Sequence, residues 1–216
     1  MNSLSDRLHY LYVILITLLF VQCDEDDDFV YPDVRTDFMD LYTDGEGMIS
    51  RVCPDSEGLL VLDSRLSGQG LRADTVYRAV GMYGVPDEEG HTSMYSATLV
   101  YAERPIRLED EEKPLTDPLQ IESVSRGGGY LNVVAQPMMQ SKAHVYAFVE
   151  DSLVNREGHA ILYLTLAHNQ NGDRESFPRR VYLSIPLQAY RLSDGDSICF
   201  RANVYDKGMT EWRVAY

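Results

Sequence analysis

Hydrophobic and polar positions alternate along most of this chain in the pattern of β-strands. Short runs rich in Val, Ile, Thr, Tyr and Phe are separated by clusters of Gly, Asp, Asn and Pro, which is typical of strands joined by turns. In the segment 75–83, Val76, Val80 and Met82 share one face, as in a half-buried strand. Five strands in about 70 residues favour a small barrel of the OB type. We expect them at residues 34–43, 48–53, 59–63, 75–83 and 93–102.

The second half of the chain carries longer alternating runs. Leu162, Leu164 and Leu166 share one face of a predicted strand, and turn residues such as Asn171-Gly172 and Asp194-Gly195 recur every dozen or so positions. This spacing favours an antiparallel β-sandwich. We expect strands at residues 119–125, 130–135, 143–150, 159–168, 179–187, 197–205 and 210–216.

A charged, proline-bearing stretch separates the two sets of strands. Residues 104–118 contain the acidic run Glu109–Glu112 and show no apolar period, which is typical of a linker. The predicted fold class is therefore all-β, a small OB-like barrel followed by an antiparallel β-sandwich. We place the barrel domain at residues 34–108, the linker at 109–118 and the sandwich domain at 119–216.

An apolar run from Leu11 to Val21 lies just before Cys23. The run is too short to cross a bilayer, which takes about 20 apolar residues, and it has the length of a signal-peptide core. A cysteine at the end of such a run resembles a bacterial lipoprotein processing site, where the thiol is acylated. We expect a signal peptide at 1–22, lipidation of Cys23 and an acidic tether at 23–33. In the alternative interpretation the peptide is an ordinary secretory one and Cys23 is incidental. Both place the mature protein outside the cytoplasm.

Five acidic residues follow the cysteine directly, and they are Asp24, Glu25, Asp26, Asp27 and Asp28. They keep the start of the mature chain in water beside the lipid. Together with the run Glu109–Glu112 they carry most of the net charge of −15. A chain this acidic repels the phosphate backbone, so we expect no nucleic-acid partner.

Several stretches of the chain resemble a known family. The acidic start is followed by Tyr31-Pro32-Asp33-Val34, and the second half contains Gly128-Gly129-Tyr130-Leu131-Asn132-Val133. Later come Leu166-Ala167-His168-Asn169 with Gly172-Asp173, and then Arg180-Val181-Tyr182-Leu183-Ser184. In these motifs the chain resembles the NigD-like lipoproteins of Gram-negative anaerobes.

The resemblance implies an N-terminal OB-like domain, a C-terminal β-sandwich and a lipid anchor in the envelope. Asp24–Asp28 resembles the export tag that sends such lipoproteins to the outer face of the outer membrane. We therefore expect a lipid-anchored outer-membrane protein exposed at the cell surface. The family is named for a gene in a bacteriocin operon. Its biochemical role is not established, and it supplies no catalytic residues.

Two groups of residues in the second half could hold a metal. Asn169, Asn171 and Asp173 alternate as the first ligands of an EF-hand loop do, but Asn171-Gly172 is also a strong hairpin-turn pair, which we favour. Residues His144, His159 and His168 could form a zinc site with an open position. Their spacing fits no known motif, and we favour ordinary strand residues.

Other features leave their alternatives open. Cys53 and Cys199 could form a bridge in an oxidising envelope or stay free. Gly127-Gly128-Gly129 precedes a strand, so it favours a closely packed turn over a phosphate loop. The 15 tyrosines could stack on sugars or anchor a protein partner, although they are also common in β-sandwiches.

The chain lacks the sequence patterns of several enzyme classes. It contains no GxSxG, no SxxK and no cysteine–histidine metal spacing. We expect no catalytic residues, no metal and no cofactor. The predicted function is binding, with an envelope or secreted protein as partner. The alternative is a surface glycan-binding accessory lipoprotein, and a surface hydrolase ranks third.

Overall fold

The computed structural model of the protein describes residues 33–109 and 112–216. The predicted signal peptide at 1–22, the lipidated Cys23 and the acidic residues Asp24–Asp28 lie outside the described residues. These three assignments therefore stay predictions. Residues 34–216 cluster into one unit that contains every described strand.

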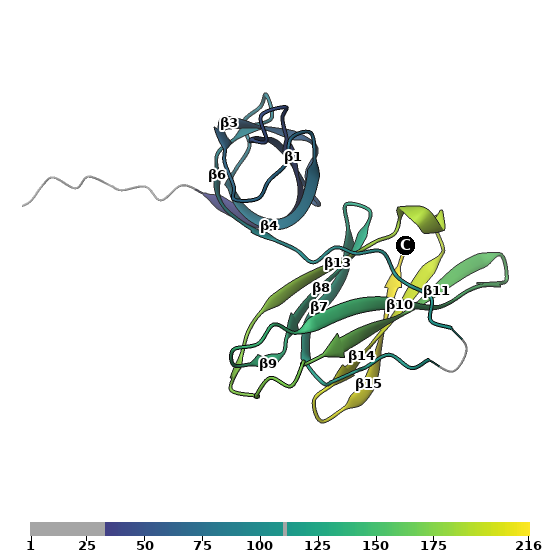
Figure 1. The fold of residues 1–216 in the computed structure, drawn as a ribbon. Coiled ribbons are helices and arrows are strands. Elements are labelled where there is room, and N and C mark those ends of the chain that lie inside the picture. The colour runs from purple at the N-terminus through teal and green to yellow at the C-terminus, as the bar shows by residue number, and fades with distance from the viewer. Residues whose placement is uncertain (1–32, 110–111) are drawn as a thin grey trace, which may run out of the picture. The chain divides into compact units, whose positions relative to one another are not determined.

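The first half of the described chain forms one curled six-stranded sheet (Figure 1). Its strands lie in the order β5-β3-β2-β1-β4-β6. All neighbours pair antiparallel except β3 and β5, which pair parallel. The bounds are β1 Val34–Thr43, β2 Ile49–Pro54, β3 Leu60–Leu66, β4 Val76–Gly84, β5 His91–Thr92 and β6 Met94–Leu99.

Strand β4 turns its small residues and tyrosines toward the barrel core. Ala79 and Tyr83 are fully buried, whereas Val76 is half exposed. The predicted apolar face with Val76 is therefore not the face that packs inside. Gly81 lies on the buried face of β4. A side chain is not tolerated there, because a Cβ would lie 2.7 Å from Sδ of the buried Met39. The missing side chain at Gly81 makes room for Met39 of β1.

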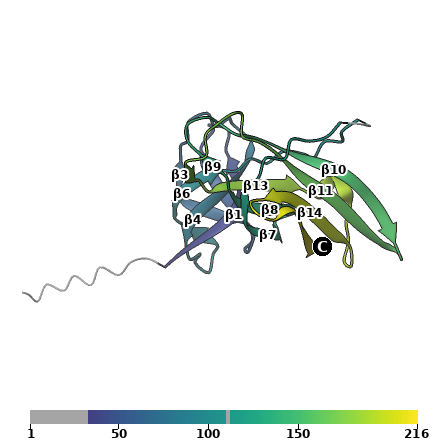
Figure 2. The ribbon, with the colours of Figure 1, turned by 90° about the horizontal axis from the view of Figure 1, so that it is seen from below.

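The second half forms two main sheets. One has the order β10-β11-β14-β15 and the other β13-β8-β7, and Figure 2 shows β10 and β11 as a long twisted hairpin. A short β9–β12 pair and one 3₁₀ turn, η1, complete the described elements. The bounds are β7 Gln120–Gly127, β8 Tyr130–Gln136, β9 Met138–Met139, β10 Val145–Arg156, β11 His159–Asn169, β12 Phe177–Pro178, β13 Val181–Pro186, η1 Gln188–Tyr190, β14 Ser197–Val204 and β15 Gly208–Ala215.

Alternating apolar residues from both sheets form the sandwich core. Leu162, Leu164 and Leu166 of β11 are at most 1% exposed, which confirms their predicted common face. They belong to one buried cluster with Leu131 and Val133 of β8. Burying a side chain of this size contributes about 1.5–3 kcal/mol. One pairing, β11 with β14, is parallel. The chain reaches β14 only after passing through β12 and β13, which belong to other sheets.

The all-β fold class is confirmed, and the differences are local. The two-residue strands β5, β9 and β12 are too short to leave an alternating pattern. Strand β10 continues six residues past the predicted end at Glu150, because a bulge absorbs the polar Asp151. Within the described ranges, no helix has the length and apolar character that crossing a bilayer requires.

The chain between β6 and β7 is bonded to the sandwich at several points. Tyr101 forms a parallel bridge with Leu183, and Ile106 forms one with Val149. The backbone N–H of His168 donates to Leu115 O at 2.8 Å. Both ends of the predicted linker are therefore fixed, and the domain bounds 34–108, 109–118 and 119–216 stay a prediction.

We expect limited proteolysis to cut first at residues 109–114, between these fixed points. The stretch is charged and bears a proline, and its described residues are exposed or half-buried. The fragments would be identified by mass spectrometry after brief digestion of the full chain. A first cut within the central strand β11 would contradict this assignment.

Candidate functional site

A bulge in β10 sets the position of the residue at the centre of the candidate site. The register of β10 against β11 shifts between Glu150 and Ser152, and a bulge of this kind re-aims a side chain. Thr165 donates its hydroxyl to the displaced Asp151 at 2.7 Å. The Glu150 backbone N–H donates to Ile106 O at 2.8 Å, which brings the 104–107 segment alongside β10.

The short turn η1 forms the opposite wall of the site. Its start is fixed because the Leu187 N–H donates to Gly129 O at 3.0 Å. The turn ends at Arg191, which has a positive φ of 50°. This left-handed conformation costs a non-glycine residue about 1–2 kcal/mol. Strained backbone conformations of this kind are concentrated at functional sites.

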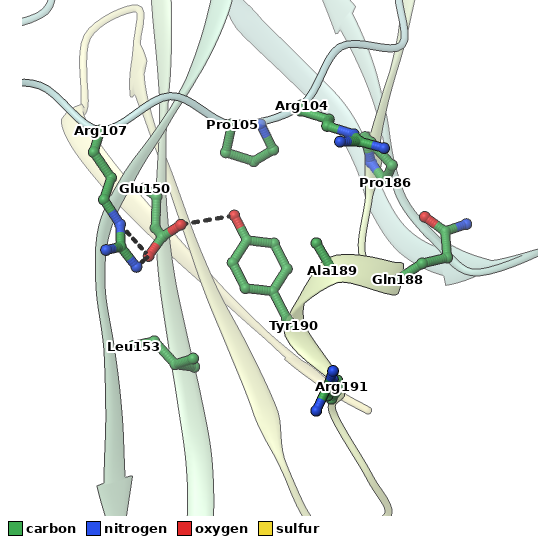
Figure 3. Close-up of a pocket in the computed structure, with 10 residues that line it drawn as sticks. All are labelled: Arg104, Pro105, Arg107, Glu150, Leu153, Pro186, Gln188, Ala189, Tyr190 and Arg191. Carbon is green, nitrogen blue, oxygen red and sulfur yellow. Dashed lines mark hydrogen bonds and ion pairs between the residues drawn. The ribbon is translucent and has the colours of Figure 1, made fainter.

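Between these walls lies a pocket of about 590 Å³, a volume in the usual range for ligand sites. Figure 3 shows Tyr190 and Glu150 facing each other across it. The remaining walls combine arginines with apolar side chains. The lining residues are Arg104, Pro105, Arg107, Glu150, Leu153, Pro186, Gln188, Ala189, Tyr190 and Arg191.

Among the described residues that line the pocket, Glu150 is the only carboxylate, and its hydrogen bonds are internal. It accepts from Tyr190 Oη at 3.0 Å and from Arg107 Nε at 2.9 Å. Burial and the bond to Glu150 raise the pKa of Tyr190 above its usual value, so its hydroxyl stays protonated as a donor. The same carboxylate raises the pKa of Arg107. Within the described chain, Arg104 and Arg191 have no acidic partner, so the pocket keeps an excess of positive charge.

The described residues that line the pocket suit the binding of an anion. Glycoside hydrolysis uses two opposed carboxylates, and the lining residues supply only Glu150. The described lining residues include no serine, cysteine or histidine that could act as a nucleophile or base. Arginine side chains, by contrast, donate in a planar fork that suits carboxylates and phosphates.

The structure brings together two of the three histidines considered as zinc ligands. The Nδ1 of His144 lies 2.9 Å from Nε2 of His168, within hydrogen-bond distance. His159 stands at the other end of β11 and packs against Gly195. The described residues contain no group of three side chains suited to a metal ion.

The Asn169–Asp173 segment is a turn, as we favoured. Asn171 and Gly172 both have positive φ, of 55° and 65°, as a type I′ turn requires. The Asn171 N–H donates to Asn169 Oδ1 at 2.7 Å. Asp173 accepts from the backbone N–H groups of Gln140 and Ser141, and these bonds hold its pKa well below the usual range.

The triple glycine is a closely packed turn because Asp55 occupies the space beside it. A Cβ on Gly127 would lie 2.6 Å from Asp55 Oδ2, and one on Gly128 would overlap Asp55 Oδ1. Asp55 also accepts from Asn132 Nδ2 at 2.7 Å and from Arg78. The motif Gly128–Val133 therefore serves a buried polar network.

Arg78 lies at the centre of that network. Its side chain is 2% exposed and pairs with Asp40 at 3.2 Å and with Asp55. It also donates to Asn132 Oδ1 at 3.1 Å and lies over the ring of Tyr130, 4.0 Å from the centroid. Burial raises the pKa of Asp40, and Arg78 opposes that shift.

Other residues singled out in the sequence are dispersed. Cys53 and Cys199 are both free, and Cys199 is buried. Among the described tyrosines, Tyr95 and Tyr101 are the exposed ones, and they lie in different segments. The arginine pocket was not predicted. The strained Arg191 follows the turn η1, and no sequence pattern around it could have identified the pocket.

Solved structures share this fold. A NigD-like immunity protein from Bacteroides caccae is 27% identical with a TM-score of 0.67, covering 86% of this chain and 93% of its own. A protein of unknown function from Bacteroides vulgatus is 19% identical with a TM-score of 0.67, covering 85% and 91%. A candidate lipoprotein from Bacteroides fragilis is 11% identical with a TM-score of 0.58, covering 86% and 98%.

The family comparison agrees with the sequence motifs. No curated protein matches the chain. Residues 104–216 match the NigD-like C-terminal β-sandwich domain. This match spans more than half of the chain and contains the whole arginine pocket. The chain therefore belongs to the NigD-like family, as its sequence motifs predict.

Proposed function

We propose that this protein is a lipid-anchored binding protein of the cell envelope. In this proposal the arginine pocket holds an acidic segment of another envelope or secreted protein. The solved NigD-like relative is described as an immunity protein, and a description of that kind fits a protein that acts by binding another protein.

The main support for this proposal is the excess positive charge of the pocket. The chain has a net charge of −15, so the protein as a whole repels an acidic partner. Arg104 and Arg191 line the pocket without an acidic partner among the described residues. Glu150 cannot neutralise them, because it already accepts from Arg107 and Tyr190. An acidic segment would therefore find an attractive field at this pocket.

The apolar lining favours a peptide segment over an inorganic anion. Pro105, Leu153 and Ala189 stand beside the arginines, and Leu153 is 42% exposed. Covering an apolar side chain contributes about 25 cal/mol per Å². A segment with one carboxylate and one neighbouring apolar side chain would satisfy both kinds of surface. Interface centres of this composition are typical of protein recognition.

In this proposal a lipid anchor at Cys23 fixes the protein to the membrane. Acylated Cys23 would hold the protein at the outer membrane, and Asp24–Asp28 would direct it to the cell surface. The fold neighbour described as a candidate lipoprotein supports the lipid anchor. We also propose that the protein is not an enzyme. Among the described lining residues the carboxylate is Glu150, which already accepts hydrogen bonds from Tyr190 and Arg107, and there is no serine, cysteine or histidine nucleophile.

Reversing the charges of Arg104 and Arg191 should strongly weaken partner binding. In the full-length chain, Arg104→Glu with Arg191→Glu is expected to reduce capture of the crosslinked partner at least tenfold, because both attractive charges become repulsive. Capture would be measured by crosslinking in cells and quantitative mass spectrometry. Binding by the unchanged protein should also weaken as salt rises.

A matched control separates local from overall charge. Arg72→Glu with Arg174→Glu makes the same change in net charge at exposed positions outside the pocket. This variant should capture the partner normally. Equal losses in the two variants would refute a role for the pocket, and so would no loss in either.

A further inference from the structure

A second pocket lies at the start of β10, apart from the arginine pocket. Its volume is about 450 Å³, and the two pockets share none of their described lining residues. His144 and Tyr146 line it from β10 and the residues just before it, and Lys142 and Arg179 add positive charge. The other lining residues are Met139, Gln140, Ser141, Ala143 and Val181.

Hydrogen-bond partners fix the protons of the two histidines. His168 Nδ1 lies 2.8 Å from Asp117 O, and a carbonyl only accepts, so Nδ1 carries a proton. Burial lowers the pKa of His168, which keeps the ring neutral and leaves Nε2 as an acceptor. The proton in the 2.9 Å contact must then come from His144 Nδ1. In a neutral His144, Nε2 therefore presents a lone pair.

That lone pair has no partner within the described chain. The His144 side chain is fully buried, and its Nε2 forms no hydrogen bond. Asp173 Oδ2 lies 3.6 Å from Nε2, but an ionised carboxylate oxygen cannot donate a hydrogen bond. A buried polar atom without a partner costs about 1–3 kcal/mol. A ligand group that donates a hydrogen bond to His144 Nε2 would remove this cost.

The hydroxyl of Tyr146 presents the complementary group. It is buried and also unpartnered among the described residues. Burial raises its pKa to about 12, so the group is a neutral O–H that can donate. The Tyr146 ring stacks on His168 with centroids 5.1 Å apart and planes 6° from parallel. This stacking fixes where the hydroxyl points.

We propose that this pocket binds a hydroxylated organic acid, such as an acidic sugar or a hydroxy acid. One ligand hydroxyl donates to His144 Nε2 and accepts from Tyr146 Oη, which satisfies both buried atoms at once. The ligand carboxylate faces Arg179 and Lys142. Lys142 Nζ donates to Asn171 O and Gly172 O, and these bonds hold its charge at the rim.

The contacts of the two histidines exclude a shared metal ion. His144 and His168 are joined by a direct hydrogen bond, and the second nitrogen of His168 is bonded to Asp117 O. A metal ligand needs a free lone pair on its nitrogen. Only His144 Nε2 offers one, and a single histidine does not make a zinc site.

The test uses the purified full-length lipoprotein in detergent and four probes. Glucuronate and lactate carry both a hydroxyl and a carboxylate, whereas glucose and acetate each carry one of the two. Calorimetric titration should show that at least one of the first pair binds more tightly than glucose and acetate. The relative affinities of glucuronate and lactate would then distinguish a sugar from a hydroxy acid. If acetate bound equally well, the hydroxyl contact would be refuted. If glucose bound equally well, the carboxylate contact would be refuted. If none of the four probes bound, the proposal would be refuted.

The variant Tyr146→Phe separates binding from folding. It removes a hydroxyl that has no partner in the described chain, so the unfolding midpoint should stay the same or rise. Affinity for the preferred probe should fall about fivefold, which corresponds to one hydrogen bond. Tyr163→Phe, outside the pocket on β11, should leave affinity unchanged. Unchanged affinity in Tyr146→Phe would overturn the proposal.

Discussion

Replacing Arg78 with methionine is expected to lower the free energy of unfolding by about 3–5 kcal/mol. The variant keeps most of the side-chain volume but leaves Asp40 and Asp55 without their counter-charge, at side-chain exposures of 17% and 10%. Asn132 and Ser184 also lose a donor. Removing one partner of a buried network leaves the others desolvated and unpaired. Chemical denaturation of the purified protein, followed by fluorescence, measures the change.

An exposed arginine of the same sheet provides the control. Arg65 bonds Asp44 at 2.9 Å and Glu46 at 2.7 Å, but its side chain is 54% exposed. Arg65→Met should change stability by less than about 1 kcal/mol, because surface ion pairs contribute little. If both variants lost the same stability, burial of the Arg78 network would not explain its effect.

Replacing Cys23 with alanine is expected to remove the protein from the membrane fraction. An acyl chain contributes about 0.8 kcal/mol per buried CH₂, and the acidic residues Asp24–Asp28 would repel an anionic surface once the chain is absent. Incorporation of a labelled fatty acid should fall to background. Cys53→Ala should incorporate label normally, and label in Cys23→Ala would show that another residue is acylated.

The acidic tag should affect location without affecting lipidation. Changing Asp24–Asp28 to alanine is expected to leave the fatty-acid label in place but protect the protein from protease added to intact cells. The unchanged protein should be digested. Protection of the unchanged protein would place it on the inner face of the outer membrane.

The strands could be predicted because their burial leaves a period of two. Leu162, Leu164 and Leu166 show it clearly, and β1 runs from Val34 to Thr43 as expected. Strand β4 shows the limit of this reasoning. Its apolar Val76 faces outward while Ala79 and Gly81 face the core, because Met39 occupies the space in front of them. The size of a facing side chain is not visible in the strand's own sequence.

The two pockets could not be predicted because their residues meet only in the folded chain. Arg104 and Arg191 are far apart in sequence, and they line the same pocket only because Ile106 pairs with β10 and η1 is held by Gly129. His144 and His168 were considered together as metal ligands. Their direct hydrogen bond depends on the register of β10 against β11.

The central claim is that the arginine pocket binds an acidic segment of a protein partner, and crosslinking from the pocket itself tests it most directly. Gln188 is exposed at the pocket and can be replaced by a photo-crosslinking amino acid in the full-length, membrane-anchored protein. Irradiation of intact cells should give one defined crosslinked protein, with the crosslink in an acidic segment. The same replacement combined with Arg104→Glu and Arg191→Glu should give none. An undiminished product in the charge-reversed protein, or no product from Gln188 at all, would contradict the account.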